Sequence, residues 1–247
     1  MRAFKTLLKT EGALSLRGMD MIIFAIFMPV TVFVLLGIIY KSKPAFDGAN
    51  YTFLEQSFGA VTTIAICAGG VMGLPLVVSD YRKKHILKRF QVTPTSPFLI
   101  LAVHLTIYAL YSFVSLFLIY AAGTIFFSFQ LHGSIVLFLC AYLLVMVSMF
   151  SIGVLIGGIA PDIKTASAAA SILYFPMLIF SGATLPYEIM PAALKKISDF
   201  MPLTQGIKLL KAASLGYSGN QMFFPILILT AIAVISITIT LRFFRWD

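Results

Sequence analysis

Long runs of apolar residues alternate along the chain with short polar connections. A helix needs about 20 mostly apolar residues, at about 1.5 Å per residue, to cross about 30 Å of hydrocarbon. Six runs meet this requirement, and they cover residues 21–40, 58–79, 98–127, 134–160, 165–184 and 222–243. The pattern predicts an all-α integral membrane protein with six transmembrane helices in a single domain, residues 1–247.

The segment before the first span, residues 1–19, has its own pattern. Phe4, Leu7 and Leu8 share one helical face and the basic residues lie elsewhere, which favours a helix in the membrane interface. A plain basic anchor is the alternative interpretation. The first span is about 20 residues long and lacks a clear small-x-small cleavage site, so we expect it to remain uncleaved.

Two outer connections differ in kind. Residues 41–57 contain turn residues and balanced charges, which predicts a short solvated loop. Residues 185–221 contain two helical patterns, 192–201 and 205–215, separated by Pro202. Both patterns are too apolar for full solvation, so we expect two short re-entrant helices that dip into the outer leaflet and line an exit path.

Composition agrees with membrane insertion and the charge distribution gives an orientation. The chain is 60% hydrophobic and 11% charged, with a mean hydropathy of +1.00, which excludes an ordinary soluble domain. Its net charge of +9 lies in the connections, so we expect membrane orientation, not nucleic-acid binding, to explain it. Twelve Lys and Arg lie on the side of the termini and six on the other, which predicts that both termini are cytoplasmic.

Within the spans, prolines and small residues predict kinks and close packing. Pro29, Pro75 and Pro176 should bend spans one, two and five. Small residues at a spacing of four in spans two, four and five let helices approach closely, either within the chain or at a subunit interface. Cys67 and Cys140 are both expected to be buried, inert thiols.

The sequence lacks several kinds of chemistry. No predicted span interior carries Asp, Glu, Lys or Arg, which disfavours an ion-coupled transporter. There is no Gly-x-x-x-x-Gly-Lys-Ser/Thr phosphate loop, so any ATP must be bound by another chain. We expect no metal or cofactor on this chain and no catalysis by it alone. A membrane-embedded enzyme with an unrecognised site is the alternative.

The densest charge in the chain lies in residues 80–97, which we expect to form a cytoplasmic loop after span two. Its first part reads Asp80-Tyr-Arg-Lys-Lys-His-Ile-Leu-Lys-Arg-Phe-Gln-Val-Thr-Pro94. This run resembles the acidic-aromatic-Arg-Glu-Lys-Gly-x-Leu-Lys-Arg-Leu-x-x-Thr-Pro motif of the permease subunits of ABC type-2 exporters. It departs from that motif at Asp80, Lys83 and His85, which make the loop more basic.

A second motif follows span five. Ser181-Gly182, Pro186, Met190-Pro191 and Met201-Pro202-Leu203-Thr204 are similar to the Ser-Gly, Pro, Met-Pro and Pro-Leu-Thr signature of the same family. The six-span layout also resembles that family over essentially the full length.

The resemblance implies a coupling helix in residues 80–97 that contacts a cytoplasmic ABC ATPase, with ATP and Mg bound on that partner. The apolar residues Ile86, Leu87 and Phe90 gather on one helical side, as expected of a buried contact. The expected coupling residues are Asp80, Arg82, Ile86, Leu87, Arg89, Phe90, Thr93 and Pro94. The expected outer-segment residues are Ser181, Gly182, Pro186, Met190, Pro191 and Pro202.

The resemblance further implies a second permease copy or paralogue as partner, in a bacterial or archaeal plasma membrane. The function it implies is export of an amphipathic substrate such as a drug, an antibiotic, a lipid-like compound or a peptide. A polysaccharide or glycolipid exporter shares this architecture and stays open. A membrane-embedded enzyme and a non-transporting sensor or scaffold are the alternatives from other classes.

Overall fold

The computed structural model describes residues 2–40, 43–46, 48–84, 86, 97–182, 191–217 and 219–244. Apart from one isolated β-bridge between Pro44 and Thr52, the regular secondary structure in these ranges consists of helices. In chain order they are α1 (Arg2–Arg17), α2 (Met19–Ile22), the π-helix η1 (Ile23–Phe27), α3 (Met28–Tyr40), α4 (Phe53–Cys67), the π-helix η2 (Ala68–Gly73), α5 (Leu74–Lys83), α7 (Pro97–Phe127), α8 (Ile135–Ile159), α9 (Ile163–Phe180), α10 (Ala192–Asp199), α11 (Pro202–Leu215) and α12 (Gly219–Phe243).

Six helices of the described part are long and apolar enough to cross a membrane, which confirms the predicted fold class. They cover Ile23–Tyr40, Phe53–Lys83, Phe98–Phe127, Ile135–Ile159, Ile163–Phe180 and Gly219–Phe243. The second span differs most from its predicted range of 58–79, because the helix starts at Phe53 and continues to Lys83. The fifth ends at Phe180, before the predicted 184, and the sixth starts at Gly219, before the predicted 222.

Two of the four prolines within the described spans follow π-helical segments. Pro29 is the second residue after η1, and Pro75 is the second residue after η2. A proline ring meets the carbonyl of the fourth residue before it, which here is Ala25 or Val71, and both lie in the π segments. The wider π turn therefore gives the ring room while the helix continues. Of the other two, Pro176 lies inside α9 and Pro225 inside α12.

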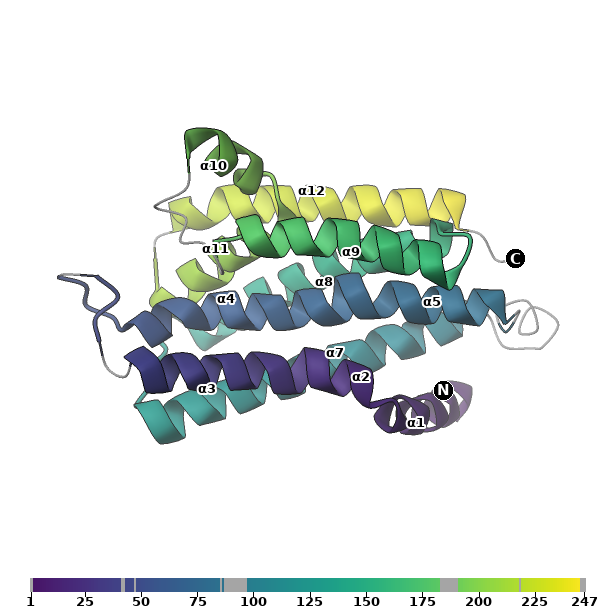
Figure 1. Ribbon diagram of the computed structural model, residues 1–247, viewed down its shortest axis with the longest axis horizontal. Coiled ribbons are helices and arrows are strands. Elements are labelled where there is room, and N and C mark those ends of the chain that lie inside the picture. Colours follow the sequence, from purple (N-terminus) through teal and green to yellow (C-terminus); the bar gives the residue numbers. More distant parts are fainter. Residues whose placement is uncertain are drawn as a thin grey trace.

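The long helices run side by side along the molecule, and α1 lies at one end of the bundle (Figure 1). Close approach depends on glycine: a Cβ on Gly153 of α8 would overlap the carbonyl oxygen of Gly70 in η2. One on Gly157 would lie 2.8 Å from Cβ of Val78 in α5. The small-residue motifs of spans two and four therefore serve packing within the chain. The α4–η2–α5 helix is buried over most of its length, whereas few residues of α3 and α9 are fully buried.

The buried core confirms one expectation about cysteine and corrects another. Cys67 is buried, as predicted, but Cys140 is exposed on α8. Cys140 lies on the face of α8 that carries the exposed residues Leu137 and Leu143, and this face points away from the neighbouring helices. The hydrophobic pattern alone could not distinguish these two faces, because α8 is apolar all round.

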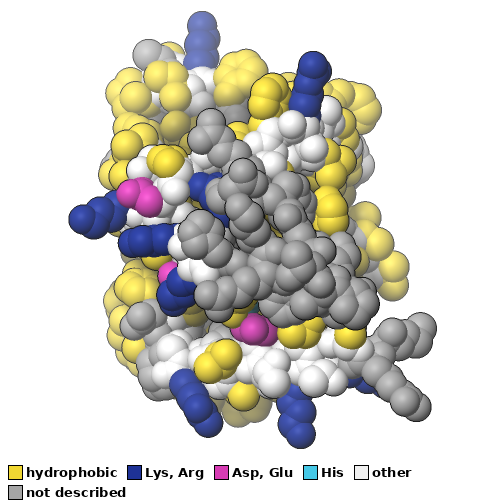
Figure 2. All heavy atoms as spheres, turned by 90° about the vertical axis from the view of Figure 1, so that its right-hand side faces the viewer, with side chains coloured by type: hydrophobic (Ala, Val, Ile, Leu, Met, Phe, Trp, Pro, Cys, Tyr) yellow, Lys and Arg dark blue, Asp and Glu magenta, His cyan; other side chains and the backbone are white. Residues whose placement is uncertain are grey.

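We call the end of the bundle that carries α1 and the last turns of α5, α8 and α12 the basic end. Both α1 and the end of α12 lie there, as an even number of spans requires (Figure 1). Viewed onto this end, Lys and Arg side chains project from it, and hydrophobic side chains lie around its margins (Figure 2). Its described basic residues on the exposed surface include Lys5, Lys9, Lys83, Lys84 and Arg242.

We call the opposite end of the bundle the far end. There the buried carboxylate of Glu55 connects two loops. Glu55 completes a capping box at the start of α4: its Oε2 accepts from the Thr52 amide at 2.7 Å. Its Oε1 accepts from the Gln130 amide at 3.3 Å and lies 4.0 Å from Nδ1 of His132. The prediction of a solvated loop over residues 41–57 is therefore wrong at Glu55, which is 6% exposed. The cap fixes this carboxylate between two loops.

Candidate functional site

The candidate site is the last turn of α5, Asp80 to Lys84, which we call the stem because it leads into the predicted coupling segment. Asp80 and Lys84 form an ion pair of 2.7 Å across one helical turn. Both side chains face the surface, so this pair supports the last turn of α5 without linking it to another helix. Of the three residues between them, Tyr81 and Arg82 contact two different neighbouring helices.

Tyr81 connects the stem to α1. Its hydroxyl donates to Oε2 of Glu11, and the same carboxylate oxygen lies 3.9 Å from Nε2 of His104 on α7. The rings of Tyr81 and His104 meet edge to face at 4.7 Å between centroids. Nearby, the hydroxyl of Tyr111 donates to Oγ of Ser15 at 2.7 Å, which makes a second contact between α7 and α1. Helix α1 is therefore held by both α5 and α7.

The apolar face of α1 predicted from the sequence is confirmed. Phe4, Leu7 and Leu8 pack against a small core that contains Ala25, Val103 and other residues of η1 and α7. The polar contacts of Glu11 and Ser15 were not predicted, because their partners lie some 70 to 96 residues away in the sequence.

Arg82 connects the stem to α8. Its guanidinium donates through one nitrogen to the carbonyl oxygens of Gly158, at 2.9 Å, and Gly157, at 3.4 Å. The other nitrogen donates to the carbonyl oxygen of Ala160. The side chain is only 3% exposed. Arg82, one of the expected coupling residues, is therefore buried against α8, and its role in coupling stays a prediction.

The remaining coupling residues are only partly described. Ile86 is half-buried. Leu87, Arg89, Phe90, Thr93 and Pro94 lie outside the described residues. The apolar patch of Ile86, Leu87 and Phe90 therefore stays a prediction, while Pro97 begins α7 as expected for a proline in the first turn of a helix.

The outer segment contains the two short helices that the sequence predicted, α10 and α11. Pro191 is the N-cap of α10 and Pro202 is the first residue of α11. Gly182 has a positive φ of 84°, which suits glycine at the end of α9. The hydroxyl of Ser181 donates back to Leu178 at 2.9 Å, and Ser198 of α10 donates to the Phe180 carbonyl at 2.6 Å. Pro186 and Met190 lie outside the described residues.

Helix α11 is buried among the long helices, since most of its side chains are inaccessible. Gly59 of α4 fits closely against its backbone, because a Cβ there would lie 2.6 Å from the Lys211 amide nitrogen. The far-end connection at Tyr217 follows α11, and its hydroxyl donates to that of Tyr51 at 2.8 Å. Desolvation by burial, together with the hydrogen bond to Tyr51, raises the pKa of Tyr217 to about 12. A position in the outer leaflet stays a prediction for both short helices.

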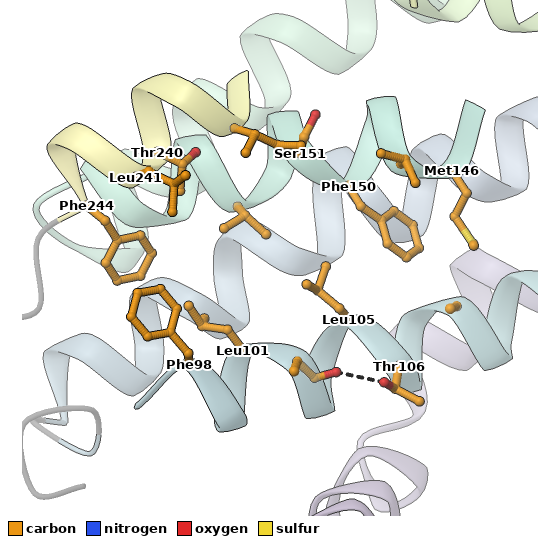
Figure 3. Close-up of a pocket in the computed structure, with 15 residues that line it drawn as sticks. Phe98, Leu101, Leu105, Thr106, Met146, Phe150, Ser151, Thr240, Leu241 and Phe244 are labelled. Carbon is orange, nitrogen blue, oxygen red and sulfur yellow. Dashed lines mark hydrogen bonds between the residues drawn. The ribbon is translucent and has the colours of Figure 1, made fainter. Parts of the chain in front are cut away.

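An apolar groove of about 560 Å³ opens between α7, α8 and α12 (Figure 3). It lies toward the basic end, with Phe98 and Phe244 at one end of it. The hydroxyls of Thr106, Ser151 and Thr240 each donate to a carbonyl of their own helix at 2.7 Å. The groove therefore presents mostly hydrocarbon and suits an apolar chain or ring better than a charged group.

The fold and this site define a multi-pass helical membrane protein. At its basic end, the stem contacts both α1 and α8. Residues 2–215 match the family model described as ABC-2 type transporter. Because this match covers most of the sequence, the chain belongs to the ABC-2 type transporter family, and the resemblance seen in the two motifs is confirmed. It is a transmembrane component of a transporter.

Curated relatives agree with this assignment over shorter regions. The inner membrane transport permeases YhhJ of Escherichia coli (strain K12) and Shigella flexneri are each 31% identical to the chain over 116 residues. That region is 47% of this chain and 31% of either relative. Nodulation protein J of Rhizobium leguminosarum bv. viciae is 32% identical over 66 residues, 27% of this chain and 26% of that protein. The chain thus matches about a third or less of each relative's length.

Proposed function

We propose that this chain is the permease subunit of an ATP-driven exporter that works as a dimer with separate cytoplasmic ATPase subunits. Membership of the ABC-2 type transporter family supports the transport role. The sequence contains no phosphate loop of its own, so the proposal assigns ATP and Mg to the partner. The excess of Lys and Arg at the basic end supports placing that end in the cytoplasm of a bacterial or archaeal cell.

The observation that carries the proposal is the position of the stem. Tyr81 contacts α1 and Arg82 contacts α8, so two successive residues join the start of the predicted coupling segment to two different helices of the bundle. A partner that displaced the coupling segment would therefore act on the membrane helices directly. This arrangement supports energy input at residues 80–97.

The substrate class we favour is amphipathic. Within the described spans, every Asp, Glu, Lys and Arg lies near a helix end, and the middle of the bundle carries none of them; these residues are Glu55, Asp80, Arg82, Lys83, Lys164 and Arg242. The groove between α7, α8 and α12 is also lined mostly by apolar side chains. Both observations favour a drug-like, lipid-like or peptide cargo with a substantial apolar part.

The dimeric state is supported by the unequal burial of the spans. Few residues of α3 and α9 are fully buried, whereas most residues of α4 and α5 are enclosed by their neighbours. A second copy or a paralogue could cover part of α3 and α9 in a way that leaves the stem accessible to the ATPase. Lipid would cover the rest.

Affinity purification from the native membrane in mild detergent, followed by mass spectrometry, tests the ATPase partner. Two variants, Leu87→Asp and Phe90→Ala, test the site of contact. Burial of either apolar side chain contributes about 1.5 to 3 kcal/mol, so each loss should weaken the association by about tenfold or more. Phe46→Ala is the matched control, because Phe46 is exposed in the far-end loop.

The expected result is loss of the ATPase and of its stimulated hydrolysis in the two variants but not in the control. Membrane insertion, followed by fractionation, should stay the same in all three. Unchanged assembly and transport in both Leu87→Asp and Phe90→Ala would exclude this contact. Purification that brings no ATPase with the wild-type chain would contradict the proposed function itself.

A further inference from the structure

We propose that Arg82 is a positioning residue that fastens the stem to the end of α8, so that displacement of the coupling segment moves α8. This inference rests on the proposed function, because it concerns how motion enters the bundle. It assigns Arg82 a role inside the permease and leaves contact with the ATPase to the apolar side chains further along the segment.

The first support is the chemistry of the end of α8. The last four carbonyls of a helix have no partner within it, and they carry the negative end of the helix dipole. Arg82 donates to Gly157, Gly158 and Ala160, which are the last residues of α8 and its C-cap. A buried guanidinium from α5 therefore closes the end of a helix that lies more than 70 residues further along the chain.

The second support is the contact that leads up to Arg82. From Gly153 to Gly157, α8 lies directly against η2 and α5, with Gly70, Pro75 and Val78 as neighbours. A Cβ at Gly157 would lie about 3.0 Å from Pro75. Contact between backbones without intervening side chains leaves little room for sliding. The guanidinium of Arg82 lies next to the last part of this contact between α8 and α5, where it bonds to the carbonyl of Gly158.

The third support is what α8 touches on its other side. A Cβ on Gly158 would lie against the ring of Phe244, which follows α12, while the carbonyl of the same glycine accepts from Arg82. Phe150 and Ser151 of α8 also line the apolar groove (Figure 3). Movement of the end of α8 would therefore change both the groove and the contact with α12.

Lys84 offers a matched comparison within the same helical turn. It carries the same charge two residues later, but it is exposed and pairs with Asp80 of its own helix. Loss of Lys84 should therefore weaken the last turn of α5 without affecting α8. A difference between the two variants would come from the contact with α8 and not from net charge.

The test compares Arg82→Ala, Arg82→Lys and Lys84→Ala in the full-length chain, purified with whatever ATPase accompanies the wild type. Hydrogen–deuterium exchange of residues 153–160 reports the last turns of α8. We expect exchange there to rise by about tenfold or more in Arg82→Ala, because the carbonyls that end α8 lose a charged donor and the last turns then open more often. Arg82→Lys should lie between, since an ammonium cannot reproduce the fork of donors. Lys84→Ala should match the wild type.

The second readout is coupling. In Arg82→Ala we expect the ATPase to bind as in the wild type, while hydrolysis stimulated by the permease falls by at least about fivefold. Unchanged exchange in Arg82→Ala would show that Arg82 does not hold the end of α8, and this conclusion would not depend on the proposed function. Increased exchange with fully retained stimulation would overturn its role in coupling. Increased exchange in a chain that binds no ATPase even as wild type would leave the fastening intact and reject the proposed function.

Discussion

Two buried ionisable residues, Arg82 and Glu55, define the two ends of the molecule at the residue scale. Arg82 satisfies the last carbonyls of α8 at the basic end, and Glu55 closes the cap of α4 at the far end. Each side chain satisfies backbone groups of a neighbouring segment, which is how a charged group can be buried at tolerable cost. Neither burial follows from the sequence, because both residues lie in polar stretches and their partners are distant.

The first prediction concerns the cap at the far end. Thr52→Ala removes the side-chain acceptor for the Glu55 amide, which lies at 3.2 Å, and should lower stability by about 1 kcal/mol. Thermal unfolding of the purified chain in detergent measures this change. Thr238→Ala is the control, because its exposed hydroxyl only donates to Val234 in the same helix. Equal midpoints for the two variants would contradict a stabilising cap.

The second prediction concerns pH at the basic end. Asp162 is the N-cap of α9, and its hydrogen bonds with Thr165 hold the pKa of this carboxyl below its usual value of 3.8. A folded-state pKa below the unfolded one stabilises the fold at pH values above the unfolded pKa. That contribution is lost as the pH falls through the folded pKa.

Asp162→Asn tests this dependence, since asparagine can cap a helix but does not titrate. The difference in stability between wild type and variant should be constant above pH of about 5 and change below about 4. Hydrogen–deuterium exchange of the first turn of α9 across this range measures it. A difference that keeps changing between pH 6 and 8 would point to another group.

At the scale of elements, hydrophobic run length was enough to predict all six spans. The bounds of the second span were missed, because the capping box at Thr52 starts the helix before the apolar run and the stem extends it beyond. The prolines were visible in the sequence, but the π segments that accommodate Pro29 and Pro75 were not. Those segments depend on how each helix meets its neighbours.

The third prediction tests the glycine contacts between helices. Gly153→Ala would place a methyl group onto the Gly70 carbonyl, so α8 and η2 must separate, at a cost of about 1 to 3 kcal/mol. Gly12→Ala is the control: no atom lies within 4 Å of a Cβ at that position of α1. It should leave stability unchanged or raise it by up to about 1 kcal/mol. Thermal unfolding in detergent compares them, and a tolerated Gly153→Ala would contradict close contact.

At the scale of the whole molecule, the bundle has one basic end, and this asymmetry predicts its orientation. The sequence count of Lys and Arg favoured the same side, because the positive-inside rule depends only on which connections carry charge. The residues that join the basic end internally, Tyr81 and Arg82, could not be recognised from the same count. They are part of one charged run in the sequence, and only the positions of α1 and α8 separate their roles.

The fourth prediction is that the basic end faces the cytoplasm and α10 faces outward. Lys9→Cys on α1 and Lys196→Cys on α10 replace two exposed lysines at opposite ends, in a chain that also carries Cys67→Ala and Cys140→Ala. A membrane-impermeant thiol reagent should label Lys196→Cys in intact cells and leave Lys9→Cys unlabelled. Inverted vesicles should give the opposite result, because moving the charges of α1 across the bilayer is unfavourable. Labelling of Lys9→Cys alone in intact cells would reverse the orientation, and the ATPase could then not reach the stem.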